Sequence, residues 1–293
     1  MSSTDSVEAL DKTLQLCDGR TLGYTEYGNP SGKALFYFGA SRLEARLLAE
    51  QAAQAGIRLI GADRPGMGLS RFKAGRHLLD WPDDVVELAD SLQIDHFAVV
   101  GNSGGGPYAL ACAYKIPDRL TACGIVSGVG PLAVFLFQRL PWLLTPMIGV
   151  MGHFFRDEEH ARKSLTWFTR SWPEPDRQSL ALPEIRAIIA ASRAEAFRQG
   201  ARGLTYDILL IEGRPWGFKL EDIAFPTLYL WHGELDKDTP IAMGRAVAER
   251  LAQCKATYYP GEGHISLIVN HREEIVTTFM SEDSHFSLIT DGR

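Results

Sequence analysis

A glycine-rich turn with a serine at its centre constrains the fold of this chain more than any other feature. The stretch VVGNSGGGP, residues 99–107, fits the pattern G-x-S-x-G. A short apolar run typical of a strand precedes it, and a helical pattern that ends near Pro117 follows it. A serine on such a strand-to-helix turn has a strained backbone and an exposed hydroxyl, and only residues as small as Gly101 and Gly105 fit beside it. Since chance matches to this pattern are common, the flanking strand and helix carry the argument.

Short apolar runs alternate with helical segments along most of the chain. The runs typical of buried parallel strands lie at residues 34–38, 58–61, 97–100, 121–126, 227–231 and 257–259. Before them, Asp18-Gly19 is a strong hairpin signal between residues 14–17 and 21–27. Strands that alternate with helices predict an α/β fold, in which a mostly parallel central sheet is flanked by helices.

The rhythm of strands is interrupted between about residues 129 and 225. This segment holds four of the six tryptophans, several prolines and helical patterns such as residues 183–199. We predict that residues 130–224 form a helical lid, inserted into a core of residues 1–129 and 225–293. The apolar side chains between residues 135 and 148 are too many to leave in water. Placed over the strand ends, they would roof a pocket for substrate, although most would only pack against the core.

A histidine is needed to activate the serine, because a neutral hydroxyl is a poor nucleophile. Of the eight histidines, His264 alone lies in a glycine-rich turn, GEGH, after a late predicted strand. His232 is its closest rival and directly follows the predicted strand that ends at Trp231. We therefore predict His264 as the general base.

A carboxylate is needed in turn to orient the imidazole. The loop after residues 227–231 contains Glu234, Asp236 and Asp238, all near enough to be considered. Asp236 is preferred because it holds the fourth place of the turn His-Gly-x-x-Asp. The chain order is then Ser103, Asp236, His264, with each residue in a turn at a strand end.

These segments resemble the α/β-hydrolase family, in particular its lid-bearing, esterase-like serine hydrolases. The stretch DRPGMGLS, residues 63–70, matches the turn D-x-P-G-x-G-x-S of that family, where Asp63 is expected to hydrogen-bond nearby backbone. The resemblance covers residues 14–129 and 225–279 and leaves the insertion uncovered. The family often has His-Gly in the loop after its early strand, and this chain has Phe38-Gly39. We expect the backbone N–H groups of Ala40 and Gly104 to form the oxyanion hole.

The identity of the nucleophile narrows the reaction. Haloalkane dehalogenases and epoxide hydrolases resemble this fold but carry aspartate in place of Ser103. What remains is acyl transfer on an ester, thioester or lactone, or a perhydrolase-like reaction. A C–C bond hydrolase or lyase using the same residues, and a ligand receptor of this fold without turnover, are the alternatives. None of these needs a metal or an organic cofactor, and we expect neither.

We expect a small-molecule acyl substrate with an apolar part. Candidate pocket residues are Phe38, Trp142 and Trp216, although simple packing is the commoner use of such rings. Three arginines on a helical pattern, Arg193, Arg198 and Arg202, could bind a carboxylate if they faced inward. Their spacing, interleaved with acidic and amide side chains, is more typical of a solvated face. The sequence leaves open a homodimer.

Composition limits partners and compartment. A net charge of −6 with no run of like charges gives no reason to expect nucleic acid as a partner. The four cysteines lie far apart, which predicts neither disulfides nor a metal site and favours a reducing, cytoplasmic compartment. The polar, acidic start lacks the pattern of a signal peptide. Residues 131–155 are mostly apolar but contain Pro141 and Pro146, so we expect no membrane span.

Overall fold

An eight-stranded sheet runs through the centre of the computed structural model, which describes residues 11–130 and 141–280. The strand order is β1-β2-β4-β3-β5-β6-β7-β8. The strands are β1 (Lys12–Gln15), β2 (Thr21–Gly28), β3 (Ala34–Phe38), β4 (Arg58–Ala62), β5 (Phe97–Asn102), β6 (Leu120–Val126), β7 (Leu228–Gly233) and β8 (Cys254–Tyr259). The β1–β2 and β2–β4 pairs are antiparallel and the others are parallel. The mostly parallel sheet is thus confirmed.

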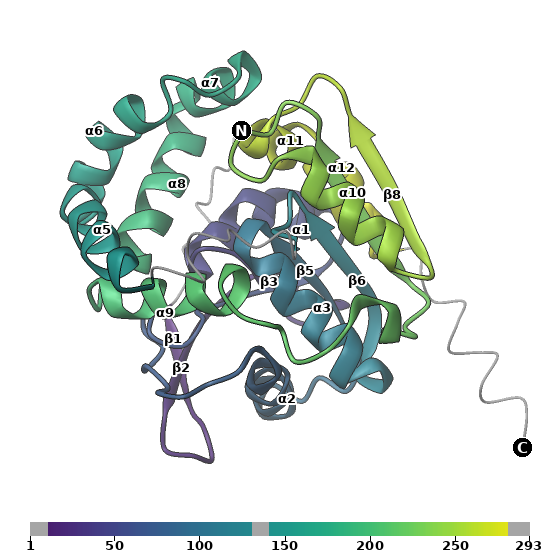
Figure 1. The fold of residues 1–293 in the computed structure, drawn as a ribbon. Helices are drawn as coiled ribbons and strands as arrows, with labels where there is room; N and C mark the ends of the chain where they lie inside the picture. The colour runs from purple at the N-terminus through teal and green to yellow at the C-terminus, as the bar shows by residue number, and fades with distance from the viewer. Residues whose placement is uncertain (1–10, 131–140, 281–293) are drawn as a thin grey trace, which may run out of the picture.

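Helices cover both faces of this sheet (Figure 1). One face packs on α2 (Trp81–Ser91), α3 (Gly106–Lys115) and α10 (Ile241–Arg250). The other packs on η1 (Arg42–Leu48), α1 (Ala49–Gln54), α11 (His264–Asn270) and α12 (Arg272–Thr278). Side chains alternate between the two cores along each strand, as Phe36 and Tyr37 do in β3. Because both faces are covered, the strands β3 to β7 are buried at nearly every position, whereas the outer strands β1 and β8 are only partly buried.

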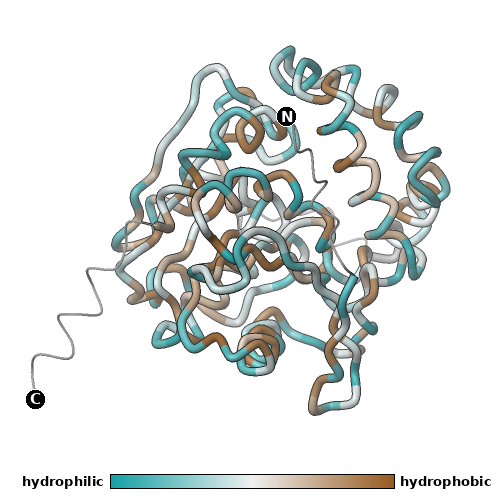
Figure 2. Tube along the Cα trace, turned by 180° about the vertical axis from the view of Figure 1, so that it is seen from behind, coloured by the Kyte–Doolittle hydropathy of each residue, from teal (hydrophilic) through white to brown (hydrophobic). Residues whose placement is uncertain are grey.

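Five α-helices follow one another between β6 and β7 in the part of the chain that the structure describes. They are α5 (Pro141–Phe154), α6 (Glu158–Phe168), α7 (Glu174–Ala181), α8 (Pro183–Ala196) and α9 (Ala201–Glu212). Figure 1 shows α5 to α8 curving around one side of the core, so the expected helical insertion is confirmed. Apolar side chains of α5, α6 and α8 join the second core cluster. In Figure 2 these helices carry both hydrophilic and hydrophobic positions.

Residues 131–140, the first part of the apolar stretch at residues 131–155, and the two chain ends lie outside the described residues. Among the helices that are described, none has the length and apolar character needed to cross a membrane.

The turn after β4 is held by Asp63, as the sequence predicts. Its carboxylate is fully buried and accepts the N–H of Leu69 at 2.9 Å and that of Arg42 at 2.7 Å. The Arg42 guanidinium pairs with the same carboxylate at 2.8 Å. Gly68 is needed here, since it has φ +49° and a Cβ on it would lie 2.1 Å from Asp63 Oδ2. The turn thereby joins η1 to β4.

Two glycines let the serine turn approach β3 closely. A Cβ on Gly101 would lie 2.3 Å from the carbonyl oxygen of Gly105. A Cβ on Gly105 would lie 1.9 Å from the carbonyl oxygen of Phe38, at the end of β3. These obstacles are backbone atoms that cannot rotate away, so the turn requires glycine at both positions.

We expect Gly105→Ala to lower the free energy of unfolding by about 3 kcal/mol, because the added methyl group forces the turn away from β3. Gly149→Ala is the matched control, since Gly149 is exposed on α5 with nothing within 4 Å of the added Cβ. That control should gain about 1 kcal/mol from helix propensity. Urea unfolding measures both. Equal stability of the two variants would contradict the close approach.

Candidate active site

Ser103 lies at the tip of the turn between β5 and α3. Its φ of +55° falls in the left-handed region, which a non-glycine residue rarely adopts. Asn102 ends β5, and the 3-10 turn η3 (Ser103–Gly105) leads directly into α3. The side chain is partly exposed, and the Ser103 carbonyl accepts the N–H of Val129 at 3.1 Å. Ser103 therefore has the strained backbone expected of such a turn, and it is partly exposed to solvent.

His264 and Asp236 form a buried pair at the same edge of the sheet. Asp236 lies in the loop after β7, and His264 begins α11 after β8. His264 Nδ1 lies 2.8 Å from Asp236 Oδ2, and both side chains are at most 2% exposed. This contact leaves Nε2 as the imidazole nitrogen that can accept a proton from another group.

Thr239 fixes this pair, and sequence reasoning missed it. Its Oγ1 lies 2.7 Å from Asp236 Oδ2, 2.9 Å from the carbonyl oxygen of Ser127 and 3.3 Å from His264 Nδ1. The other carboxylate oxygen of Asp236 accepts the N–H groups of Asp238 and Thr239 at 2.9 and 2.8 Å. The sequence signal that could have identified it is a threonine three residues after Asp236.

The alternative residues in the same loop have other partners. His232 Nε2 lies 2.7 Å from the carbonyl oxygen of Thr239 but 3.9 Å from Asp236 Oδ2. Burial lowers the pKa of His232, which favours its neutral form. Glu234 is exposed and pairs with Arg245 at 3.2 Å, and Asp238 is exposed. The structure thus brings together the two residues that the sequence argument preferred.

The charges in the pair stabilise each other. Burial would raise the pKa of Asp236, but His264 and the hydrogen bonds from Thr239 outweigh it and lower the pKa to about 2. Burial would lower the pKa of His264, but the charge and hydrogen bond of Asp236 raise it to about 9. Asp238 adds to this rise, and Arg193 opposes it. The pair therefore favours an ionised Asp236, and it stabilises the imidazolium that forms when His264 takes up a proton.

Ser103 and His264 are not hydrogen-bonded to each other within the described residues. Backbone contacts nevertheless link their loops. Val129 donates to the Ser103 carbonyl, and Thr239 contacts the Ser127 carbonyl two residues earlier. Such catalytic contacts are often long before substrate binds, so the separation does not argue against a shared site.

The two expected oxyanion donors differ in their surroundings. Gly104 follows Ser103 at the start of a helical segment, where backbone N–H groups favour negative charge. The Ala40 N–H instead donates to Glu44 Oε2 at 3.1 Å. Glu44 is buried and also accepts from Tyr37, Asn102 and Ser192, at 2.9, 2.8 and 3.2 Å. Sequence reasoning missed this carboxylate, and Ala40 can bind an oxyanion only by sharing or exchanging that bond.

The aromatic pocket residues are mostly packing residues. Phe38 is fully buried and meets the Trp81 ring edge-on at 5.2 Å, so it packs in the core, and its contact with substrate stays a prediction. Because helices cover both faces of the sheet, a ring on one of its strands packs into one of the two cores. Trp216 is buried, and its Nε1 donates to the Ile211 carbonyl at 2.9 Å. Trp142 lies on α5, but its side chain is outside the described residues.

The three arginines have different surroundings. Arg198 is exposed and pairs with Glu195 at 3.4 Å. Arg202 is exposed, and its guanidinium lies over the Phe72 ring at 4.1 Å. Arg193 on α8 is half-buried, has no hydrogen bond or ion pair within the described residues, and lowers the pKa of His264. Arg198 and Arg202 therefore lie on the solvated face that the sequence predicts, and Arg193 does not.

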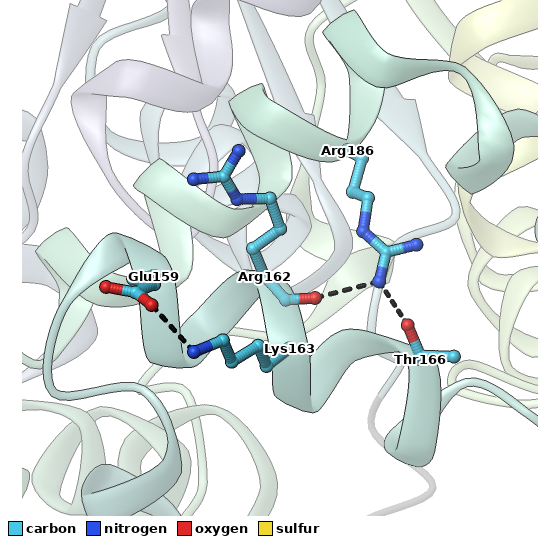
Figure 3. Close-up of a pocket in the computed structure, with 5 residues that line it drawn as sticks. All are labelled: Glu159, Arg162, Lys163, Thr166 and Arg186. Atoms are coloured by element: carbon cyan, nitrogen blue, oxygen red, sulfur yellow. Dashed lines mark hydrogen bonds and ion pairs between the residues drawn. The ribbon is translucent and has the colours of Figure 1, made fainter.

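A basic hollow lies elsewhere on the lid, between α6 and α8 (Figure 3). It contains no candidate catalytic residue, and Arg186 there donates to the Arg162 carbonyl at 2.8 Å. Over residues 11–130 and 141–280, no group of three or more His, Cys, Asp or Glu side chains is arranged to hold a metal ion.

Three curated proteins resemble parts of this sequence. An uncharacterized hydrolase, YcgS, of Bacillus subtilis is 29% identical over 38% of this chain and 39% of its own length. A putative carbamate hydrolase, RutD, of a Caulobacter species is 27% identical over 73% of this chain and 76% of its own. A 2-hydroxy-6-oxo-2,4-heptadienoate hydrolase of Pseudomonas putida is 32% identical over 25% of this chain and 27% of its own. The chain thus spans less than half of two of these relatives.

Solved structures share the fold over nearly the whole chain. A bromoperoxidase of Bacillus anthracis has a TM-score of 0.72 at 19% identity, covering 92% of this chain and 99% of that one. An esterase of Exiguobacterium antarcticum has a TM-score of 0.69 at 16% identity, covering 93% and 98%. The sequence model of the alpha/beta hydrolase family matches residues 28–278. With its central sheet, serine turn and buried His–Asp pair, the chain belongs to the alpha/beta hydrolase family.

Proposed function

We propose that this protein is a serine hydrolase that works by acyl transfer, with Ser103, His264 and Asp236 as its triad. The observation that carries the proposal is the buried 2.8 Å contact of His264 with Asp236, at the sheet edge that also presents a serine with φ +55°. An imidazole held by a carboxylate on one nitrogen is arranged to take a proton on the other.

The reaction begins when Ser103 Oγ attacks the substrate carbonyl carbon and His264 Nε2 takes the hydroxyl proton. The oxyanion that forms is stabilised by the Gly104 N–H and by the Ala40 N–H, once the latter exchanges Glu44 for the substrate. His264 then gives its proton to the leaving group, and the acyl group stays on Ser103. A water molecule, deprotonated by His264, attacks the acyl-enzyme, releases the acid and restores the serine.

The substrate class is a carboxylic ester or related acyl compound with an apolar part. The lid supports this, since apolar side chains of α5, α6 and α8 lie in the core cluster that also contains Ile265, beside His264. The carbamate named for the Caulobacter relative is a related acyl compound that the same triad could attack.

Hydrolysis of a C–C bond is the second candidate, and the Pseudomonas relative favours it. Its name describes a hydrolase of an oxo acid, and the half-buried Arg193 near His264 would suit the carboxylate of such a substrate. A diketone-type substrate distinguishes this activity from ester hydrolysis.

Ser103→Ala should lower kcat on p-nitrophenyl esters by at least about 10⁴-fold, because no acyl-enzyme can form. Ser31→Ala, at an exposed loop position, is the control and should keep full activity. Comparing esters of increasing acyl length sizes the pocket. Turnover that persists in the Ser103 variant would refute the assignment. A folded native protein that neither cleaves esters nor reacts with a fluorophosphonate would point to a ligand receptor.

The pH profile tests the role of His264. The base must be neutral to act, and its pKa is raised to about 9, so kcat/KM should rise with pH up to about that value. Arg193→Gln removes a positive charge that lowers this pKa, so its rising limb should move to higher pH. Arg198→Gln is the matched control on the same lid segment and should leave the limb in place. A limb that moves to lower pH in Arg193→Gln would contradict this electrostatic assignment.

A further inference from the structure

The lid places a buried carboxylate on the helix that begins with the candidate base. Asp176 belongs to α7 of the lid and is 1% exposed. Its Oδ2 accepts the N–H of His264 at 3.0 Å, and its Oδ1 accepts those of Ile265 and Ser266 at 2.9 and 2.8 Å. No arginine or lysine pairs with it among the described residues. Within residues 11–130 and 141–280, backbone amides alone therefore bind this carboxylate.

The first N–H groups of α11 need an acceptor from another part of the chain. The first N–H groups of a helix have no partner within it and normally bond a side chain just before the helix. Here the preceding residue is Gly263, which has no side chain to offer, and a Cβ on it would lie 2.1 Å from Asp176 Oδ2. A side chain 88 residues earlier in the sequence takes that place instead.

His264 is thereby held from two sides. The core holds its ring, through the 2.8 Å contact of Nδ1 with Asp236. The lid holds its backbone, through Asp176, and the ring of Trp172 from the lid lies 6.4 Å from the imidazole. A lid that moved away from the core would remove the only acceptor of the His264 N–H among the described residues.

We propose that Asp176 is a positioning residue, through which the docked lid fixes the general base for catalysis. The inference rests on the proposed function, since it concerns the same His264. It assigns the lid a second role: besides covering the substrate, its docking orders the base. Binding of a substrate that stabilises the docked lid therefore also favours the reactive position of the imidazole.

Several charged or titratable groups surround His264 and affect its protonation. Asp236 and Asp238 lie in the loop after β7, and His232 lies at the end of β7. Arg193, on α8, opposes the imidazolium through its positive charge. Asp176 adds a negative charge against the backbone of the same residue. Removal of that charge disfavours the imidazolium, so the rising limb of the pH profile should move to lower pH.

The test compares Asp176→Asn with Asp157→Asn. The asparagine keeps one oxygen for the N–H groups of Ile265 and Ser266 but turns an NH₂ group toward His264. Asp157 is the matched control, since it accepts the N–H of His160 at the start of α6 in the same lid, far from the base in sequence and exposed. Rates are expressed per active serine, titrated with a fluorophosphonate, so that misfolded protein does not count.

We expect Asp176→Asn to lower kcat on a p-nitrophenyl ester by roughly 10-fold to 100-fold with little change in KM. Its rising pH limb should move to lower pH, while Asp157→Asn keeps the native rate and limb. A residue that only stabilises the lid would lower the melting temperature and the titrated fraction, and leave both readouts unchanged. Native rates per active serine in Asp176→Asn would overturn the proposal.

Gly263→Ala provides an approach from the core side, because its methyl group displaces the carboxylate without removing it. It should reproduce the defect, and the double variant with Asp176→Asn should be no worse than either one. Additive losses would contradict the shared contact.

If the native protein neither cleaves an ester nor reacts with a fluorophosphonate, the proposed function has failed, and hydrogen exchange still decides the contact. The amides of residues 264–266 should exchange faster in Asp176→Asn than in the native protein and in Asp157→Asn. Unchanged exchange would overturn the inference independently of activity.

Discussion

Buried carboxylates that accept hydrogen bonds from backbone amides fix the loops at the edge of the sheet where the candidate site lies. Asp63 bonds amides of η1 and the turn after β4, and Glu44 bonds one in the loop after β3. Asp236 bonds its own loop after β7, and Asp176 bonds the start of α11 after β8. A buried carboxylate is costly unless several donors satisfy it, so each fixes the relative positions of the segments that it joins. The loops that carry the candidate site are therefore coupled to one another.

Local patterns predicted the fold and the core of the site because their causes are local. The serine turn requires glycine at Gly105, and the order of three strand-end turns follows from chain topology. The contacts of Glu44 and Asp176 could not be predicted in this way. Glu44 binds Asn102 and Ser192, 58 and 148 residues away, Asp176 binds the His264 N–H 88 residues away, and no spacing rule connects them. The core that the Phe38 ring joins could not be predicted for a related reason, since an apolar strand covered on both faces does not reveal which side a ring faces.

The lid contacts the core through polar side chains as well as apolar ones. The sequence suggested a roof of apolar side chains, and much of it does join the second core cluster. Yet Asp176 reaches the helix of His264, and Ser192 reaches Glu44 at 3.2 Å beside the oxyanion loop. These two contacts lie at opposite parts of the proposed machinery, one at the base and one at the oxyanion loop. Docking of the lid therefore affects the positions of both the base and the oxyanion loop, although neither contact involves the reacting atoms.

Electrostatics around the proposed oxyanion hole follow from two buried groups of opposite charge. Glu44 holds the Ala40 N–H and would repel a developing oxyanion if it were the only charge nearby. Arg64, 4% exposed, donates to the Gly104 carbonyl at 2.7 Å and pairs with Asp207 of the lid at 2.9 Å. Asp207 also pairs with Arg76 at 2.9 Å, so the group of two guanidiniums and one carboxylate keeps a positive charge, opposite in sign to Glu44. The lid contributes Asp207 to one group and Ser192 to the other, so both groups depend on the docked lid.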